Sequence, residues 1–240
     1  MHIDTTFDFR SDSRGKDPDI CSPTLRRYHQ LLWSKPLPDG TVFTLEDLRS
    51  HGYLRHRSER GEFRMSSDTV LRTFSIHKRM QHIITQVPEV EREDVLRRGY
   101  TIGGMILFPG VKVGGKHTIN QARGINAKLE DRFDLTLECI RRHYAGESSP
   151  LAPALARYAA FFRLFGDFRG YVDFFLLKDL IADDYSAVRF WAPFDDFTSS
   201  PLPANIDAYR RYRTEMIGWI EARNRRIETS CSERDDPYRN

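Results

Sequence analysis

The chain has 240 residues, of which 40% are hydrophobic and 30% charged, and its formal net charge is +3. This composition is typical of a globular protein and excludes the disordered, fibrous and membrane-embedded classes. Cys21, Cys139 and Cys231 are far apart and form no C-x-x-C pair, which argues against a disulfide framework and a zinc ribbon. We expect no signal peptide, and no apolar run is long enough to span a bilayer. We therefore expect a cytoplasmic protein that makes no membrane contact.

The predicted elements are mixed strands and helices in the first half of the chain and mainly helices in the second. Residues 1–21 are acidic and turn-rich, and Ser22-Pro23 is typical of an N-cap followed by proline at the first helical position. A helix follows, which Pro36 ends. The hydrophobic periodicity then predicts strands at 41–45, 53–57, 62–65, 100–108, 116–120 and 187–191, and helices at 75–87, 89–98, 129–144, 151–165, 170–182 and 204–227.

This order of elements predicts an α+β fold. We expect a small mixed or antiparallel sheet from the N-terminal half, packed against a mostly helical C-terminal half. No linker, internal repeat or low-complexity tract divides the sequence. We therefore expect a single domain over residues 1–240, with a polar and frayed tail at 229–240.

Arginine dominates the basic residues, with 30 arginines against seven lysines. A guanidinium binds phosphate or carboxylate through two parallel hydrogen bonds, whereas an ammonium group is a point charge. A GC-rich genome produces the same bias without a functional reason. The basic residues nevertheless gather in segments 49–79 and 210–227, whereas segment 167–196 is acidic. We expect surfaces of opposite sign, which face either solvent or each other.

The familiar catalytic motifs are absent from the sequence. It lacks the P-loop, the Rossmann glycine pattern, the H-E-x-x-H zinc motif and the G-x-S-x-G nucleophile elbow. Asp39 followed by Glu62 is weakly similar to the carboxylate pattern of metal-dependent nucleases, although a turn at Asp39 is the simpler explanation. We assign no metal site, and the sequence identifies no cofactor. Three more carboxylates share one face of the predicted helix 129–144, where ion pairs with the following arginines account for them: Asp131, Asp134 and Glu138.

The segment 100–142 contains the strongest candidate for a ligand site. A glycine pair at 103–104 interrupts an apolar strand, which lets a ligand or another backbone approach closely. Backbone N–H groups at the helix start that follows could bind an anion such as phosphate, together with Lys116, Asn120 and Arg123. The alternative is structural, because Asn120 can cap the helix and Arg123 can pair with a carboxylate.

Further basic residues and two histidines extend this candidate site. Arg55, Arg57 and Arg142 would enlarge the positive surface. His56 lies between two arginines, and because their charges disfavour its protonation, we expect a neutral imidazole that could act as a base. His117 is beside the expected anion and is the other acid–base candidate, although strand alternation turns it away from the preceding lysine. His56 also has a structural explanation in packing or hydrogen bonding.

The predicted helix 204–227 indicates a second kind of function. It combines an apolar stripe with arginines, a pattern that fits a protein partner, a polyanion or a solvated face. Our leading hypothesis is that the protein binds a phosphate-bearing ligand, either a nucleotide or nucleic acid, and in its stronger form that it processes this ligand. The alternatives are a non-catalytic interaction protein, such as a regulatory or immunity partner that uses helix 204–227, and a metal-dependent nuclease.

Five stretches of the sequence bear on its family. They are SPTLRRYH at 22–29, LWSKPLP at 32–38, YTIGGM at 100–105, RFDLTLECIRRHY at 132–144 and FGDFRGYVDFF at 165–175. In these stretches the chain resembles an uncharacterised family of bacterial proteins of about this length. The resemblance covers nearly the whole chain, which implies one domain. It implies no activity and no functional residue.

Overall fold

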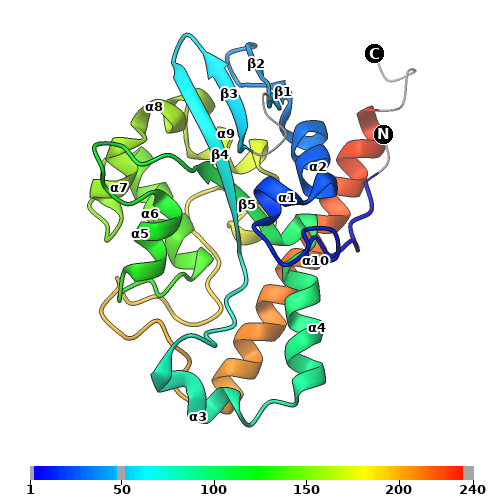
Figure 1. Ribbon diagram of the computed structural model, residues 1–240. Helices are drawn as coiled ribbons and strands as arrows, with labels where there is room; N and C mark the ends of the chain where they lie inside the picture. Colours follow the sequence, from blue (N-terminus) through cyan, green and yellow to red (C-terminus); the bar gives the residue numbers. More distant parts are fainter. Residues whose placement is uncertain (1–2, 48–51, 235–240) are drawn as a thin grey trace.

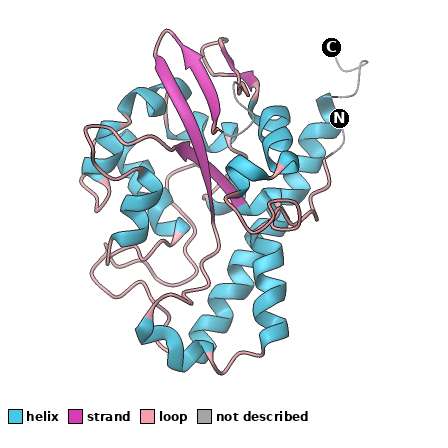
Figure 2. Ribbon diagram, viewed as in Figure 1, coloured by secondary structure: helices cyan, strands magenta, loops and turns pink. Residues whose placement is uncertain are grey.

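The computed structural model describes residues 3–47 and 52–234 (Figure 1). All its strands come from the N-terminal half of the chain and form two antiparallel sheets, and helices make up most of the C-terminal half (Figure 2). The predicted α+β class is therefore confirmed, with the antiparallel form of the sheet.

In the larger sheet β5 lies near the centre of the molecule and the hairpin of β3 and β4 extends to its upper edge (Figure 1). The longest strand, β4, separates β3 from β5. β5 is buried along its whole length, as its continuous apolar sequence requires. β1 and β2 form a two-stranded sheet of their own. The strands are β1 (Lys35–Pro36), β2 (Val42–Phe43), β3 (Leu54–Ser58), β4 (Gly61–Thr69) and β5 (Met105–Pro109).

Helices surround this sheet, and the last of them, α10, runs along one side of the molecule beside α4 (Figure 1). The α-helices are α1 (Pro18–Cys21), α2 (Pro23–Trp33), α3 (Gln81–Ile84), α4 (Glu89–Gly99), α5 (Ile119–Ile125), α6 (Phe133–Ala145), α7 (Ala152–Arg157), α8 (Ala159–Phe162), α9 (Phe168–Phe174) and α10 (Ile206–Arg234). Four 3-10 turns complete the set: η1 (Lys78–Met80), η2 (Ile102–Gly104), η3 (Arg163–Phe165) and η4 (Lys178–Leu180).

Several predicted elements are corrected by the structure. Residues 116–118 form no strand, because Thr118 caps α5 and the helix starts at Ile119. Segment 187–191 contributes only one isolated bridge, between Val188 and Ile181. The predicted helix 75–87 is reduced to η1 and α3. The tail predicted to fray at 229–240 is helical as far as Arg234, because α10 continues, and its last six residues lie outside the described part of the chain.

The glycine pair at 103–104 permits a close approach of backbones. A β-carbon on Gly104 would lie 2.1 Å from the backbone oxygen of Gly99, and one on Gly103 would lie 2.6 Å from that of Ile220. The amide N–H of Gly103 donates to Asn224 of α10 at 2.7 Å. Of the two expectations for this pair, the approach of another backbone is therefore the one that occurs.

One hydrophobic cluster runs from Ile3 to Cys231 and joins both halves of the chain. The aromatic residues of α8 and α9 lie within it, as predicted for core positions; Phe161 and Tyr171, for example, are fully buried. α10 contributes Tyr212 and Met216, which are also fully buried. The apolar stripe of α10 therefore packs against the chain itself.

Candidate functional site

Arg123, the centre of the predicted anion site, is fully buried in α5. Its guanidinium pairs with Asp131 at 3.1 Å and with Asp68 at 3.3 Å. It also donates to the backbone oxygen of Asp131 and to Thr136 Oγ1. Each of its three nitrogens therefore already has a protein acceptor, and the complete burial of the side chain keeps a ligand away from it. The structural alternative for Arg123 is the one the fold adopts.

The start of α5 does not form the expected cradle for an anion. Lys116 and His117 are exposed in the turn before the helix. Asn120 points its amide toward β4, where Nδ2 lies 3.4 Å from a backbone oxygen. Thr118 rather than Asn120 caps the helix, and its capping box with Gln121 engages backbone donors at the helix start, within this described segment.

The other predicted arginines are paired and lie in different places. Arg142 on α6 pairs with Glu138 at 2.8 Å and with Asp196 at 2.6 Å. Arg55 and Arg57 on β3 share Glu62 of β4, at 3.2 and 3.0 Å. The structure therefore does not gather these arginines around one hollow.

The pKa of His56 is lowered for a different reason from the one predicted. It is fully buried and stacks on Phe43, with the ring centroids 4.0 Å apart. Burial lowers its pKa because it penalises the charged imidazolium. Nδ1 lies 3.1 Å from the backbone oxygen of Thr44. The flanking arginines pair with carboxylates and so do not account for the shift. The pKa is lowered, as expected, but the cause is burial in the core.

The nuclease alternative gains no support from the structure. Asp39 accepts from Thr41 and pairs with Arg60 at 2.7 Å, which fits a turn residue. Glu62 is engaged by the arginines of β3. Among the described residues no group of three or more His, Cys, Asp and Glu side chains is placed to hold a metal ion.

Three arginines of α10 are used within the fold. Arg213 pairs with Glu91 at 3.4 Å and Arg226 pairs with Asp179 at 2.8 Å. Arg223 is buried and donates to three backbone oxygens. The use of this helix to bind a protein partner stays a prediction. Of its arginines, only those that face outward are available to contact such a partner.

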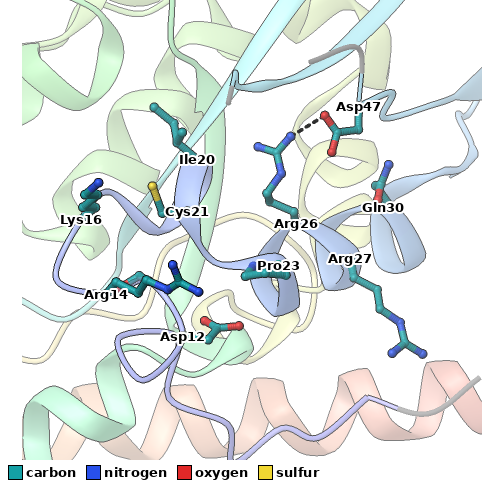
Figure 3. A pocket seen from close by; sticks show the side chains of 11 residues that line it. Asp12, Arg14, Lys16, Ile20, Cys21, Pro23, Arg26, Arg27, Gln30 and Asp47 are labelled. Atoms are coloured by element: carbon teal, nitrogen blue, oxygen red, sulfur yellow. Dashed lines mark ion pairs between the residues drawn. The ribbon is translucent and has the colours of Figure 1, made fainter. Parts of the chain in front are cut away.

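A different basic site lies at the N-terminal edge of the molecule. A pocket of about 550 Å³ separates the turn at 12–16 from α2 (Figure 3). We call it the α2 pocket. It is lined by Asp12, Ser13, Arg14, Lys16, Ile20, Cys21, Pro23, Arg26, Arg27, Gln30 and Asp47.

Two consecutive helix caps shape this pocket. The Asp17 carboxylate accepts from the amide of Asp19 and starts α1. The Ser22 hydroxyl accepts from the amide of Leu25 at 3.0 Å and starts α2, with Pro23 at the first helical position. The cap predicted at Ser22-Pro23 is therefore confirmed. The sharp change of direction between α1 and α2 opens the space that the pocket occupies.

The turn before α1 carries backbone strain. Arg14 and Gly15 both have left-handed angles, with φ of 56° and 71°. Glycine adopts this conformation freely, whereas for a residue such as arginine it costs about 1 kcal/mol or more. The amide of Lys16 donates to the Ser13 oxygen at 3.1 Å and closes the turn. Arg14 and Lys16 thereby line the pocket on the side opposite α2 (Figure 3).

Arg26 forms the fixed inner wall of the pocket and is 7% exposed. Its Nη1 donates to the backbone oxygens of Asp19 and Gly52, each at 2.6 Å, and its Nη2 pairs with Asp47 at 2.6 Å (Figure 3). These contacts neutralise the guanidinium and hold it in place.

Asp19 lies beneath the pocket in α1 and ties it to the sheet. The carboxylate accepts from the amide and hydroxyl of Ser67 and from the hydroxyl of Ser66. The pKa of Asp19 is raised to about 7: burial is the largest cause, the hydrogen bonds from Ser67 act against it, and the nearby charge of Asp17 adds to the rise. Asp19 therefore titrates near neutral pH one residue away from the pocket lining.

Three cations remain available in the α2 pocket. Arg14, Lys16 and Arg27 have no side-chain partner among the described residues. Asp12 accepts from the amide of Thr24 at 3.1 Å, so its carboxylate is partly engaged. Four basic and two acidic side chains line the pocket, which gives it a formal charge of +2.

None of these lining residues belongs to the site predicted from the sequence. The reason is that the aspartates of segment 1–21 mask Arg14 and Lys16 when charge is counted along the chain. One sequence pattern could have indicated this pocket. A basic turn is followed by the cap at Ser22 and then by Arg26 and Arg27 on α2. Only the fold shows that these segments line the same pocket.

Within the described ranges, no helix has both the length and the apolar composition needed to cross a membrane. The chain belongs to a family described as a family of unknown function (DUF6994), whose model matches residues 3–227. This match confirms the resemblance to an uncharacterised family that covers nearly the whole chain. No curated protein and no solved structure matches the sequence.

Proposed function

We propose that the protein binds a small phosphate-bearing ligand of mononucleotide size in the α2 pocket. The observation that carries this proposal is that three unpaired cations, Arg14, Lys16 and Arg27, line one pocket. The four arginines that were candidates for an anion site elsewhere are all paired with carboxylates, as Arg123 and Arg142 illustrate.

The charge of the pocket supports a dianion. The ion pair between Arg26 and Asp47 is internally neutral, and Asp12 offsets one of the three free cations. The remaining charge of +2 matches a phosphate monoester near neutral pH. Two arginines can each grip phosphate oxygens through a pair of hydrogen bonds, and the lysine adds a point charge.

The size and the remaining walls of the pocket support an organic group attached to the phosphate. A volume of about 550 Å³ is much larger than a free phosphate needs and falls in the range of small-molecule sites. Ile20, Pro23 and Cys21 supply apolar surface on which a sugar or base can pack. Gln30 supplies an amide beside them.

A mononucleotide fits this arrangement better than nucleic acid does. Arg14, Lys16 and Arg27 line a single pocket. A polynucleotide requires instead a groove of positive charge along many phosphates. Among its described lining residues the pocket has no histidine to serve as an acid or base near neutral pH. Binding, without a chemical step, is therefore the function we propose.

Thermal unfolding with a panel of ligands tests this function. The panel contains the four nucleoside 5′-monophosphates, the corresponding nucleosides, inorganic phosphate and a single-stranded oligonucleotide. At least one monophosphate should raise the melting temperature progressively with concentration, because it binds only the folded state. Its nucleoside should not.

Two outcomes would contradict the proposal. The absence of a shift with every phosphate-bearing probe would reject the ligand class. Stabilisation by the oligonucleotide alone, with affinity that falls steeply as salt rises, would replace the mononucleotide with nucleic acid.

A further inference from the structure

Residues 189–205 contain neither helix nor strand and lead from the bridge at Val188 to α10 (Figure 1). A loop of this length within a folded domain is uncommon unless it serves a function. Together with the starts of α6 and α10, it encloses a pocket of about 220 Å³, which we call the loop pocket. The loop pocket shares no lining residue with the α2 pocket.

Side-chain contacts hold the loop 189–205 in a strained backbone conformation. Asp196 and Phe197 both have left-handed angles, with φ of 59° and 61°. Arg142 pairs with Asp196 at 2.6 Å, and its guanidinium lies 5.1 Å from the centre of the Phe197 ring. The Asp195 carboxylate accepts from the amide of Ser199 at 2.8 Å. These contacts fix the pocket wall before any ligand arrives, which reduces the entropy lost on binding.

Aromatic side chains form one wall of the loop pocket. Trp191 packs between the guanidinium of Arg132, 5.1 Å from its ring, and the edge of Tyr212 at 5.6 Å. The charge of Arg132 is satisfied by Asp134 at 2.5 Å, so Arg132 supports the indole rather than a ligand. Phe194 lies in the same wall. The buried Nε1–H of Trp191 has no acceptor among the described residues and is an unused donor.

Two basic side chains without a partner among the described residues lie beside this aromatic wall. Lys128 and Arg211 line the pocket and have no side-chain partner in the described part of the chain. Asp195 also lines it and contributes one negative charge. With Arg132 neutralised by Asp134, the loop pocket has a net charge of +1. This charge matches a monoanion, in contrast to the charge of +2 in the α2 pocket.

We infer that the loop pocket binds a small aromatic carboxylic acid. The aromatic ring packs on Trp191 and Phe194, where planar rings gain contact energy beyond their buried area. The carboxylate accepts charge-assisted hydrogen bonds from Lys128 and Arg211. The positive ends of α6 and α10, which both begin at the pocket, favour the same anion. The volume of about 220 Å³ suits one ring with a short acidic side chain and is small for a nucleotide.

Phenylacetate is a suitable probe, because it does not absorb where tryptophan is excited. Trp191 lines the pocket, whereas Trp33 and Trp219 do not. Phenylacetate should therefore change the tryptophan fluorescence in a saturable way, and Trp191→Phe should remove this change. The uncharged analogue phenylacetamide should bind at least about tenfold more weakly, because it lacks the charge-assisted bonds.

Paired variants locate the site. Lys128→Gln with Arg211→Gln should weaken phenylacetate binding by about tenfold or more, as measured by calorimetry. Lys112→Gln with Arg210→Gln makes the same charge change at exposed positions outside both pockets and should leave the affinity unchanged. No binding to the wild-type protein, equal affinity for the amide, or equal affinity in both double variants would overturn the inference. These outcomes are independent of the α2 pocket, whose variants should bind phenylacetate normally.

Discussion

Asp19 couples the stability of the fold to pH through one buried carboxylate. Burial raises its pKa to about 7, well above the ordinary aspartate value of 3.8 that it regains on unfolding. The folded state therefore favours the protonated form. The stability that Asp19 contributes through its proton is fully present below about pH 4 and is lost as the pH rises through 7. The total change in the unfolding free energy over this range is about 4 kcal/mol.

The variant Asp19→Asn isolates this effect. An asparagine cannot ionise, so the unfolding free energy of wild type minus that of the variant should fall steadily between pH 4 and pH 8. Chemical denaturation at each pH measures it. Asp183→Asn, at a side chain that is 94% exposed, should leave the pH profile of the wild type unchanged. A constant difference between wild type and Asp19→Asn would contradict the assigned role of burial.

Individual residues were the hardest level to predict from the sequence. For Arg123, both a ligand role and an ion pair were open, because the decisive fact is its complete burial beside Asp68 and Asp131. Asp68 lies on β4, more than 50 residues away, so no local pattern could indicate that contact. The pattern of the sequence hid Arg14 and Lys16 for the converse reason. The aspartates near them in the sequence form no ion pair with them among the described residues.

At the level of elements, the contact between η2 and α4 requires glycine. A β-carbon on Gly104 would lie 2.1 Å from the backbone oxygen of Gly99, and neither backbone can yield without moving its element. Gly104→Ala should therefore lower the unfolding free energy by about 2–3 kcal/mol, measured by urea denaturation.

Gly218→Ala is the matched control for this substitution. Gly218 lies inside α10, is exposed, and a β-carbon there would meet nothing within 4 Å. Alanine should raise the unfolding free energy by about 0.5–1 kcal/mol, because it has the higher helix propensity. Equal effects of the two substitutions would contradict the close contact at Gly104.

Elements were predicted well where a local signal fixes them. Ser22-Pro23 gave the start of α2, and the β3–β4 hairpin falls on the two predicted strands at 53–57 and 62–65. Prediction failed where capping competes with apolar periodicity. Thr118 turns the end of a predicted strand into the start of α5, and the aromatic run at 151–165 divides into short helices that fit around the core.

Across the whole molecule, Arg223 joins α10 to the centre of the fold. It is 3% exposed and donates to the backbone oxygens of Phe175, Gly103 and Met105 at 2.6–3.1 Å. Burial lowers the pKa of its guanidinium to about 10, because desolvation penalises the charge. Three segments that are distant in the sequence thus depend on one side chain.

Arg223→Lys should be strongly destabilising even though it keeps the charge. A lysine has no planar fork to reach three oxygens at once, so buried carbonyls lose their donors and the unfolding free energy falls by about 3 kcal/mol. Thermal and urea denaturation measure the change. Arg225→Gln removes an exposed neighbouring arginine on α10 and should change the unfolding free energy by less than about 0.5 kcal/mol. Similar losses in both variants would refute the anchoring role.

The overall charge pattern was predicted in outline. Segments 167–196 and 210–227 have opposite signs, and the two are joined by the ion pair of Asp179 with Arg226. Pairing of this kind removes many of the 30 arginines from consideration as ligand sites. The cations left without partners in the α2 pocket are therefore more informative than the total charge of +3.

The most direct test of the α2 pocket is calorimetric titration of AMP into the wild-type protein and two triple variants. One variant combines Arg14→Gln, Lys16→Gln and Arg27→Gln. The other combines Arg64→Gln, Arg92→Gln and Lys112→Gln, which removes the same charges from exposed positions outside the pocket.

We predict that AMP binds the wild type and the control variant with equal affinity. The pocket variant should bind at least about tenfold more weakly, because it loses the charge-assisted bonds to phosphate. Equal affinity of AMP for the two triple variants, or no binding of AMP to the wild type, would contradict the proposed function.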